Sequence, residues 1–401
     1  MLAPSWRIIG KKVYWLSIPD TKSRLFENIW PIPNGVNYNA YLIAGDDEYL
    51  LIDSSKAIFT SEELVRVIKE ITDPSKIRKI AVLHTEPDHS GLISGILSRI
   101  GNPIVYSTSR ASFFMRSMFN LETNVVKDGD EITIGNRILR VIELPWIHWP
   151  DTMFLYLEDE KILFSSDAFG AFGALEKPVF DDEIDFVKYM HEAKEYFATV
   201  VVTYRQMVLR ALDKVSRLGI NPEIIAPSHG AVLRSRIKEF MKELLSWCNM
   251  EKKRKITIIY GTMYGLTEKL AEFAKNIISR KVEVVMHNAV GNDLNHVLSD
   301  VLDSAGVLFI TPIYEGNIFP PITNLIELMR IKKLGEGKIS AVVVTKLWGG
   351  AAANKIPILL KDAGYDVLSP VREYVNYPNE SDLRDYEDFL QSFIDKVLEN
   401  F

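Results

Sequence analysis

Residues 80–91 of this chain read Ile-Ala-Val-Leu-His-Thr-Glu-Pro-Asp-His-Ser-Gly. An apolar run ends here, and it is followed by four side chains of types that bind metals: His84, Glu86, Asp88 and His89. An ordinary turn needs one Asp or Asn, not two imidazoles and two carboxylates. This density of ligand types therefore predicts a metal site directly after a buried strand.

Three more residues of the same types stand at the ends of predicted strands. His148 follows an apolar run that ends at residue 145, Asp167 closes the run 161–166, and His229 follows residues 224–227. Loops at strand ends are where rigid scaffolds place functional groups. The other histidines, at positions 191, 287 and 296, fall in helical or surface-like contexts, and we expect them to be structural.

Four imidazoles and three carboxylates exceed what one zinc ion with three protein ligands and a water requires. They fit two metal ions that share a bridging carboxylate and each keep an open position. Mixed imidazole and carboxylate ligation suits iron, manganese and zinc alike. The alternative, unrelated polar loop residues, must explain both the local cluster and its recurrence at three strand ends.

The composition is that of a globular protein of two or more domains, with 401 residues, 47% apolar and 25% charged. A net charge of −6 without a basic stripe argues against a nucleic-acid partner. The one cysteine, Cys248, excludes an internal disulfide, and we expect it to be a buried thiol. There is no signal-like N-terminus and no apolar run of membrane-spanning length, so we expect a cytoplasmic protein without a membrane partner.

The first 250 residues mix strands and helices. Residues 6–60 alternate short apolar runs with turn signals, which predicts antiparallel strands. Residues 109–119 are helical in pattern, with Phe113, Phe114, Met115 and Met118 expected in the core. Residues 185–203 and 206–218 predict two long helices.

A basic run at residues 251–255 predicts a linker between a domain of residues 1–250 and a domain of residues 256–401. In the second domain, apolar strands alternate with helical stretches. This βαβ rhythm predicts a doubly wound parallel sheet, so the fold class of the chain is α/β.

The first strand of the second domain runs into Gly261-Thr-Met-Tyr-Gly-Leu-Thr267 at the start of a helix. Such a loop presents backbone N–H groups and hydroxyls to a phosphate. It lacks Gly-x-Gly-x-x-Gly and the lysine of a P-loop, which favours flavin mononucleotide over a dinucleotide or ATP. The alternative is an ordinary helix capped by Thr267.

Two further loops follow strands, at residues 311–320 and 345–351, where open α/β sheets bind ligands. Tyr314 and Trp348 are candidates to pack on the isoalloxazine ring, although either can be ordinary packing. Gly349 and Gly350 would allow close approach of the backbone.

The hexapeptide His84-Thr-Glu-Pro-Asp-His89 is similar to the His-x-His-x-Asp-His sequence of the metallo-β-lactamase fold, with Glu86 in place of the second histidine. With that exchange, and with residues 146–153, 164–167 and 227–230, the chain closely resembles the flavodiiron proteins over essentially its whole length. The resemblance implies an N-terminal metallo-β-lactamase-like αββα sandwich followed by a C-terminal flavodoxin-like domain.

The resemblance also implies two non-haem iron ions and FMN. One iron would be bound by His84, Glu86 and His148, the other by Asp88, His89 and His229, with Asp167 between them. The residues expected at FMN lie in the three loops of the second domain: Thr262, Met263, Tyr264, Gly265, Leu266, Thr267, Pro312, Tyr314, Glu315, Gly316, Asn317, Ile318, Lys346, Trp348, Gly349 and Gly350. Leu266 replaces an asparagine of many free flavodoxins.

The family reduces dioxygen to water, nitric oxide to nitrous oxide, or both, as a head-to-tail homodimer or a dimer of such dimers. In that dimer the flavin of one subunit lies beside the di-iron site of the other. The chain has no Cys-x-x-Cys, so electrons are expected from an external donor: rubredoxin, another reductase or a reduced deazaflavin cofactor. Glu27 stands where many members have a pocket histidine, which leaves the preferred gas open. Tyr196 and Tyr204 are pocket hydroxyls or structural tyrosines.

Two other functions are compatible with these domains. One is a zinc hydrolase of the metallo-β-lactamase type with the flavodoxin domain as a passenger, and Glu86 argues against it. The other is an electron carrier whose N-terminal domain is structural.

Overall fold

Two β-sheets pack face to face in the first part of the chain, because alternating apolar residues of both sheets meet in one core. Val13, Trp15 and Tyr41 come from one sheet, and Leu155 and Phe164 from the other. In the first sheet the strand order is β1 (Ser5–Gly10), β2 (Val13–Asp20), β5 (Val36–Ala44), β6 (Tyr49–Ile52), β7 (Ile77–Ala81), β8 (Ile104–Thr108) and β9 (Asn124–Val126). In the second it is β10 (Glu131–Ile134), β11 (Arg137–Glu143), β12 (Met153–Leu157), β13 (Ile162–Phe164) and β14 (Ile224–Ala226).

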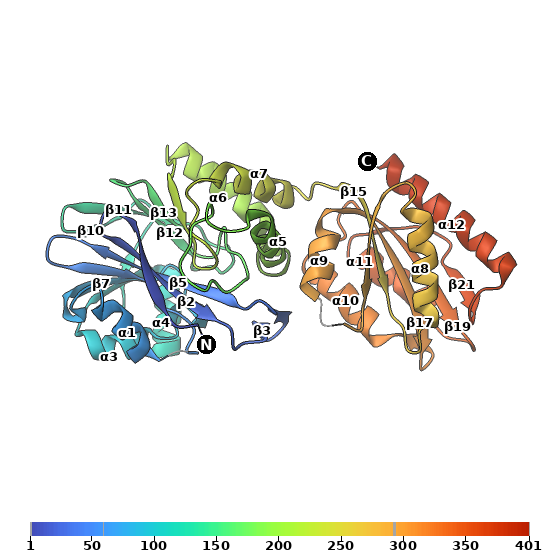
Figure 1. Ribbon diagram of the computed structural model, residues 1–401, viewed down its shortest axis with the longest axis horizontal. Coiled ribbons are helices and arrows are strands. Elements are labelled where there is room, and N and C mark those ends of the chain that lie inside the picture. Colours follow the sequence, from blue (N-terminus) through green and yellow to red (C-terminus); the bar gives the residue numbers. More distant parts are fainter. Residues whose placement is uncertain (1, 59, 292–293, 401) are drawn as a thin grey trace. The chain divides into compact units, whose positions relative to one another are not determined.

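Helices cover the outer faces of this sandwich, which gives the expected αββα arrangement (Figure 1). One side carries α1 (Ser61–Lys69), α3 (Ile93–Ile100) and α4 (Ser109–Phe119), and the other carries α5 (Phe186–Tyr196), α6 (Arg205–Arg217) and α7 (Ile237–Cys248). Shorter elements are a hairpin of β3 (Leu25–Phe26) and β4 (Trp30–Pro31), the 3₁₀ turn η1 (Pro74–Lys76) and the one-turn helix α2 (Pro87–Ser90).

The helix expected over residues 185–203 changes its winding. After α5 the chain forms a π-helix, η2 (Phe197–Val201), and then a 3₁₀ turn, η3 (Val202–Tyr204). The expected core of α4 is also partly wrong, because Phe113 is 66% exposed and Met118 is 42% exposed, whereas Met115 is buried. Apolar residues occur on several sides of this helix, so their spacing did not identify which face is buried.

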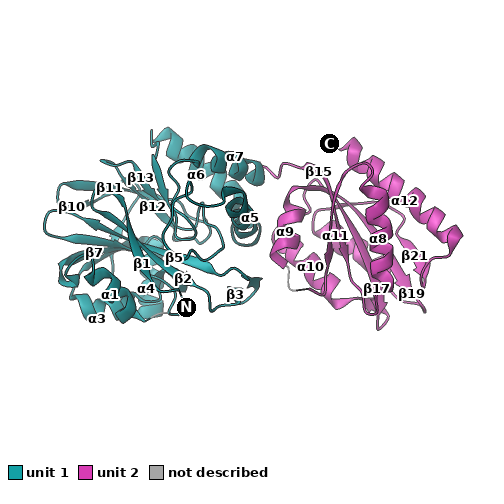
Figure 2. Ribbon diagram, viewed as in Figure 1, with its two compact units in different colours: residues 1–248 teal, residues 249–401 magenta. Residues whose placement is uncertain are grey.

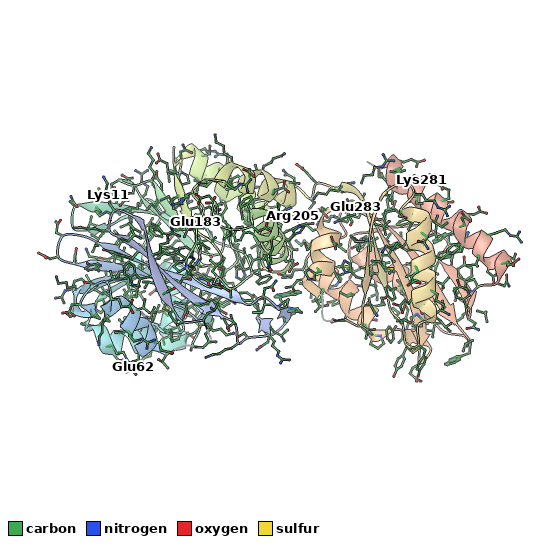
Figure 3. The ribbon with its side chains drawn as sticks, viewed as in Figure 1. Lys11, Glu62, Glu183, Arg205, Lys281 and Glu283 are labelled. Atoms are coloured by element: carbon green, nitrogen blue, oxygen red, sulfur yellow. The ribbon has the colours of Figure 1, made fainter. Side chains whose placement is uncertain are left out.

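The structure is a computed structural model that describes residues 2–58, 60–291 and 294–400. The chain divides into two compact units, residues 1–248 and 249–401 (Figure 2). Of the predicted linker, Lys253 and Lys255 belong to β15, and Lys255 is buried beside Asp303. Charged side chains such as Lys11 and Lys281 lie at the outer surface, whereas Arg205 is buried in the helical layer of the first unit (Figure 3).

The second unit is a parallel sheet with helices on both faces (Figure 1). Its strand order is β16 (Glu283–Asn288), β15 (Lys253–Tyr260), β17 (Ser304–Tyr314), β19 (Ile339–Lys346) and β20 (Asp366–Val367), with β18 (Asn317–Ile318) paired to β17 and β21 (Arg372–Val375) to β19. The helices are α8 (Leu266–Ile278), α9 (Leu294–Asp303), α10 (Pro320–Ile331), α11 (Ala352–Asp362) and α12 (Glu380–Glu399). Because β15, β17 and β19 run parallel, the loops after them meet at one edge of the sheet.

Candidate functional site

The seven ligand-type residues of the first unit stand in loops that follow strands of both sheets. His84 follows β7, and Asp88 and His89 lie in α2 directly after it. His148 lies between β11 and β12, Asp167 follows β13, and His229 follows β14. Since β13 and β14 pair in parallel, their carboxyl ends lie at the same edge of the sheet. This packing brings residues far apart in the sequence to one place.

The ligand atoms form two groups, each within 4.8 Å of one another. The first group contains His84, Glu86, His148 and Asp167, and the second contains Asp88, His89 and His229. All four histidines contact the carboxylates of the cluster through Nε2.

Asp167 stands between the two groups and offers one oxygen to each. Its Oδ2 lies 3.4 Å from Nε2 of His84 and 3.3 Å from Nε2 of His148. Its Oδ1 lies 2.9 Å from Nε2 of His89 and 3.2 Å from Nε2 of His229. This is the arrangement that a carboxylate bridging two metal ions requires.

Several buried polar atoms of this cluster have no hydrogen-bond partner among the described residues. They are Oδ1 of Asp88, both carboxylate oxygens of Asp167, and Nε2 of His89 and His229. An unsatisfied buried polar atom costs about 1–3 kcal/mol, so the concentration of such atoms in one spot needs a compensating partner. A pair of metal ions supplies it, and the imidazole and carboxylate donors fit iron, manganese or zinc.

The metal-free cluster is strongly coupled electrostatically. Burial lowers the pKa of the histidines, but Asp167 and neighbouring carboxylates outweigh it and raise the pKa of His148 to about 10 and that of His229 to about 9. Burial raises the pKa of Glu86, but the rings of His148 and His84 lower it to about 2. Glu86 is therefore ionised at neutral pH, as is Asp167, whose pKa is lowered well below its usual value chiefly by His89 against the effect of burial, and a metal ion must displace protons from His148 and His229.

A second layer of groups orients the histidine rings. Nδ1 of His84 lies 3.2 Å from Oδ1 of Asp151, whose Oδ2 accepts hydrogen bonds from the backbone N–H and hydroxyl of Thr85 at 2.8 and 2.6 Å. Nδ1 of His89 lies 3.5 Å from Oδ2 of Asp53. Such partners fix the tautomer and the direction of a metal-binding imidazole.

Sequence reasoning missed this layer, although it contained a signal. Asp53 directly follows β6 in the left-handed region (φ 56°) and accepts a hydrogen bond from the backbone N–H of Leu83 at 2.8 Å. The orienting partner of His229 is the backbone carbonyl of Asn37, whose oxygen lies 2.9 Å from Nδ1. The sequence gives no signal for this contact, because every residue type has a backbone carbonyl.

The three predicted pocket residues have different places. Tyr196 is buried, and its ring centre lies 5.5 Å from that of His229. Glu27 is exposed and accepts a hydrogen bond from the indole of Trp30 at 2.9 Å. Tyr204 is half-buried, and its ring stacks on Trp146 with centres 6.0 Å apart. Of the three, Tyr196 has a direct ring contact with a residue of the metal cluster.

The second unit has a cavity of about 320 Å³ where the loops after β15 and β19 meet. Several predicted flavin residues line it: Thr262, Met263, Tyr264, Leu266, Thr267, Pro312, Lys346 and Trp348. Sequence reasoning missed four other lining residues: Ile313, Thr345, Leu347 and Asn376. Asn376 follows β21, and the hydrogen bond from its backbone N–H to the carbonyl of Lys346 joins it to the pocket.

Other predicted flavin residues do not line this cavity. Asn317 and Ile318 line a separate groove between α10 and α11. Gly350 is needed for packing within the protein, since a Cβ there would lie 2.9 Å from Cδ1 of Ile313. Tyr314, Glu315, Gly316 and Gly349 are also outside the lining, and Gly265 rather than Thr267 is the N-cap of α8.

The chemistry of this cavity nevertheless fits a flavin. Tyr264 is 93% exposed and Trp348 is 65% exposed, so two aromatic faces stand open at the pocket rim for a planar ring to cover. The N-terminus of α8, with its unpaired backbone N–H groups, and the hydroxyls of Thr262 and Thr267 suit a phosphate.

The chain is similar to known proteins over most of its length. Residues 36–230 match the ODP family beta lactamase. The chain is 32% identical to an uncharacterized protein of Methanocaldococcus jannaschii, in an alignment that covers 95% of this chain and 96% of that protein. It is 31% identical to a nitric oxide reductase of Moorella thermoacetica, in an alignment that covers 93% of this chain and 94% of that protein.

Solved structures give the same result. A flavo di-iron protein mutant from Thermotoga maritima matches with a TM-score of 0.89 and 28% identity over 99% of this chain and 100% of that chain. The rubredoxin oxygen:oxidoreductase of Desulfovibrio gigas, with a TM-score of 0.94 and 24% identity over 99% of both chains, shares the fold. The fold and site define a flavin-linked metalloprotein of the metallo-β-lactamase type. The chain belongs to the flavodiiron protein family, as its sequence predicted. Among the described residues, no helix has the length and apolar character needed to cross a membrane.

Proposed function

We propose that this protein is a flavodiiron oxidoreductase that reduces dioxygen to water, nitric oxide to nitrous oxide, or both. The observation that carries the proposal is Asp167, which offers one carboxylate oxygen to each of two ligand groups. Dioxygen takes up four electrons and four protons to give two waters. Two molecules of nitric oxide take up two electrons and two protons to give nitrous oxide and water.

In this proposal His84, Glu86 and His148 would hold one iron, Asp88, His89 and His229 would hold the other, and Asp167 would offer an oxygen to each. FMN would bind in the cavity of the second unit. When bound, these groups supply one-electron transfer and an open coordination position for the gas. Glu86 favours iron over the zinc of hydrolases, because an anionic oxygen ligand stabilises the ferric state.

The chain itself positions the ligands and holds protons. Asp151 and Asp53 orient the rings of His84 and His89, respectively, with Nε2 toward the cluster. Burial and the nearby carboxylates raise the pKa of Tyr196 well above its ordinary value. Its hydroxyl therefore keeps its proton at neutral pH beside His229, where it is able to donate a hydrogen bond.

The test is anaerobic reduction of the flavin in the iron-loaded protein, followed by stopped-flow mixing with dioxygen and, separately, with nitric oxide. We expect at least one gas to reoxidise the protein faster than it reoxidises free FMN. If neither does so, the proposed function is wrong.

Metal analysis separates this function from the hydrolase alternative. Two zinc ions together with esterase or thioesterase turnover would contradict the di-iron proposal. The electron-carrier alternative predicts full carrier activity after Asp88→Ala, whereas our proposal predicts loss of gas reduction with the flavin still bound.

A head-to-tail homodimer, or a dimer of such dimers, is part of the proposal. Rings of Trp149, Phe114 and Phe113 lead outward from His84 with successive centres 5.1, 6.2 and 5.9 Å apart, and Phe113 is 66% exposed. In the second unit Trp348 is similarly exposed at the flavin cavity. Exposed apolar groups beside both sites favour an interface that joins them. Sedimentation should give twice the chain mass, and the specific activity should fall on dilution. A fully active monomer would contradict the dimer.

The electron donor is proposed to be a separate protein or cofactor: rubredoxin, another reductase or a reduced deazaflavin. The chain is 29% identical to a protein of Escherichia coli that is named an anaerobic nitric oxide reductase flavorubredoxin, and it covers 76% of that protein. Steady-state assays with each donor class identify the one that reduces the flavin at a rate matching turnover. A cytoplasmic location agrees with the single cysteine.

A further inference from the structure

The flavin cavity of the second unit has a single cationic side chain in its lining. Of the described residues that line this cavity, Lys346 is the one that carries a charge, and the others are apolar, aromatic, hydroxyl-bearing or, at Asn376, an amide. Lys346 is the last residue of β19, so the sheet fixes its position. Its side chain is 28% exposed, which leaves part of it accessible from the cavity.

The ammonium group of Lys346 is paired with a carboxylate that lies outside the lining. Its Nζ lies 2.7 Å from Oε2 of Glu373 in β21. In the register of the two strands Val375 stands opposite Lys346, so Glu373, two residues earlier, projects to the same face of the sheet. The two side chains are 28% and 34% exposed, and an ion pair this exposed contributes little to stability. Stability alone therefore does not account for a lysine at this position.

The place of Lys346 in the sheet favours the ring end of the flavin over its phosphate. The groups that suit a phosphate, which are the N-terminus of α8 and the hydroxyls of Thr262 and Thr267, follow β15. Because β17 lies between β15 and β19, Lys346 is displaced from these groups by two strand spacings, or about 10 Å. Trp348, whose ring stands open for the isoalloxazine, lies two residues after Lys346 in the same loop.

Reduction gives the isoalloxazine ring a negative charge. The oxidised ring is neutral, and it becomes an anion when it takes up two electrons from the donor and one proton from the solvent. A nearby cation stabilises the anion more than the neutral ring, and charge close to the ring is one of the means by which a protein tunes a flavin. A cation in this cavity therefore raises the reduction potential of the bound FMN, and a neighbouring carboxylate reduces that effect.

We propose that Lys346 stabilises the anionic, reduced state of FMN, and that Glu373 is a positioning residue that holds the ammonium group and partly offsets its charge. This inference rests on the proposed function, which supplies the FMN in the cavity. The pair thereby sets how readily the flavin accepts electrons from the donor and passes them on to the metal centre.

The test is anaerobic potentiometric titration of the FMN in the holoprotein with a chemical reductant. Lys346→Met keeps the length of the side chain and removes its charge. It should weaken the binding of reduced FMN about tenfold relative to oxidised FMN, which is the lower end of the range for a hydrogen bond to a charged group. For a two-electron couple a tenfold change corresponds to about 30 mV, so the midpoint potential should fall by this amount. Glu373→Gln should raise the potential, because it removes the counter-charge.

Three further variants separate charge from packing. Lys346→Arg keeps the charge and should have a potential close to that of the unmodified protein. The double variant with Lys346→Met and Glu373→Gln should shift the potential less than Lys346→Met alone, because no uncompensated carboxylate remains. Lys355→Met is the matched control and should leave the potential unchanged, since Lys355 is an accessible lysine of the second unit that lines the separate groove between α10 and α11.

An unchanged potential in Lys346→Met would overturn the inference. Equal weakening of oxidised and reduced FMN by this substitution would also overturn it, because that result is expected of a lysine at the phosphate. If Lys346→Met does not retain FMN, Glu373→Gln decides, and an unchanged or lowered potential in that variant would overturn the inference.

The potentials are measured without gas, so they are independent of turnover. If the unmodified holoprotein reduces neither dioxygen nor nitric oxide, the proposed function fails, while the potentials still decide the role of Lys346. If the potentials of the variants are unchanged while the unmodified protein reduces either gas, the inference fails and the proposed function stands.

Discussion

The sharpest prediction concerns Asp151, which contacts His84 but is not one of the seven ligand-type residues. Its Oδ2 accepts two hydrogen bonds from Thr85, so its other oxygen is left to accept a hydrogen bond from Nδ1 of His84. This arrangement keeps the proton on Nδ1 and leaves the lone pair of Nε2 available to a metal.

In Asp151→Asn the amide oxygen is expected to stay at the backbone N–H of Thr85, because this N–H can only donate and an NH₂ group in its place cannot accept. The NH₂ group then faces Nδ1 of His84, and two donors cannot share this contact. The imidazole must move its proton to Nε2 or turn away, and both outcomes remove a metal ligand.

Loss of an orienting partner of this kind weakens metal binding by about 10- to 100-fold, or about 1.4–2.8 kcal/mol. Only the group of His84, Glu86 and His148 should be affected. Asp53→Asn is the matched variant for the other group, because Asp53 stands 3.5 Å from Nδ1 of His89.

The assay is competition with a chelator, followed by iron analysis and by spectroscopy of the coupled iron pair. At a chelator concentration that leaves the unmodified protein with two irons, Asp151→Asn should retain about one, with FMN content unchanged. If Asp151→Asn loses both irons equally, or binds both as tightly as the unmodified protein does, the reasoning is refuted.

Three further predictions test the metal cluster, the flavin cavity and an ion-pair cluster of the second unit. By metal analysis, Asp167→Ala should lose both irons and keep FMN. Asp88→Ala, which changes one ligand group, should keep one iron. Equal iron loss in the two variants would contradict a bridging role of Asp167. Trp348→Ala should weaken FMN binding about 2- to 12-fold in flavin fluorescence titrations, as expected for loss of one aromatic contact of about 0.5–1.5 kcal/mol. Ile358→Ala, outside the cavity, should leave FMN binding unchanged. Equal FMN affinities of Trp348→Ala and the unmodified protein would exclude stacking. Asp300 of α9 lies 2.8 Å from Nε2 of His287 and 3.0 Å from Nζ of Lys255. Burial raises the pKa of Asp300, but these two partners lower it well below the usual value of 3.8. Its contribution to stability is therefore present above about pH 4 and lost as pH falls toward the lowered pKa. Urea midpoints of the unmodified protein and Asp300→Asn should therefore converge between pH 4 and pH 2, and a constant difference would refute this.

The exposed apolar residues of α4 show why a helical pattern is insufficient to locate a core. Phe113 and Met118 were expected inside, but both are exposed, and Phe113 is the outermost of the rings that lead from His84. The pattern records which residues are apolar, whereas burial depends on which side of the helix the sheet occupies.

The π-helix and part of the lining of the flavin cavity were not predicted from the sequence, for a related reason. Residues 197–201 read Phe-Ala-Thr-Val-Val, and no local pattern in this segment distinguishes a π-helix from an α-helix. Asn376 joins the flavin cavity because the short strand β21 pairs with β19, a long-range pairing that no local pattern announces.

The sequence by itself predicted a metal site and the types of its ligands. His84, Glu86, Asp88 and His89 are close in the chain, so their spacing alone predicts a metal site, and a carboxylate at position 86 separates this chain from the hydrolases of similar fold. Alternation of strands and helices also determined the doubly wound class of the second domain.

Only the tertiary structure decided how the ligands are shared and supported. Asp167 directs its two oxygens to different groups because β7, β13 and β14 end at the same edge of the packed sheets. Asp151 and Asp53 contact His84 and His89, respectively, and these contacts join segments that are distant in the sequence. These features depend on side-chain geometry in three dimensions, and spacing along the chain does not specify it.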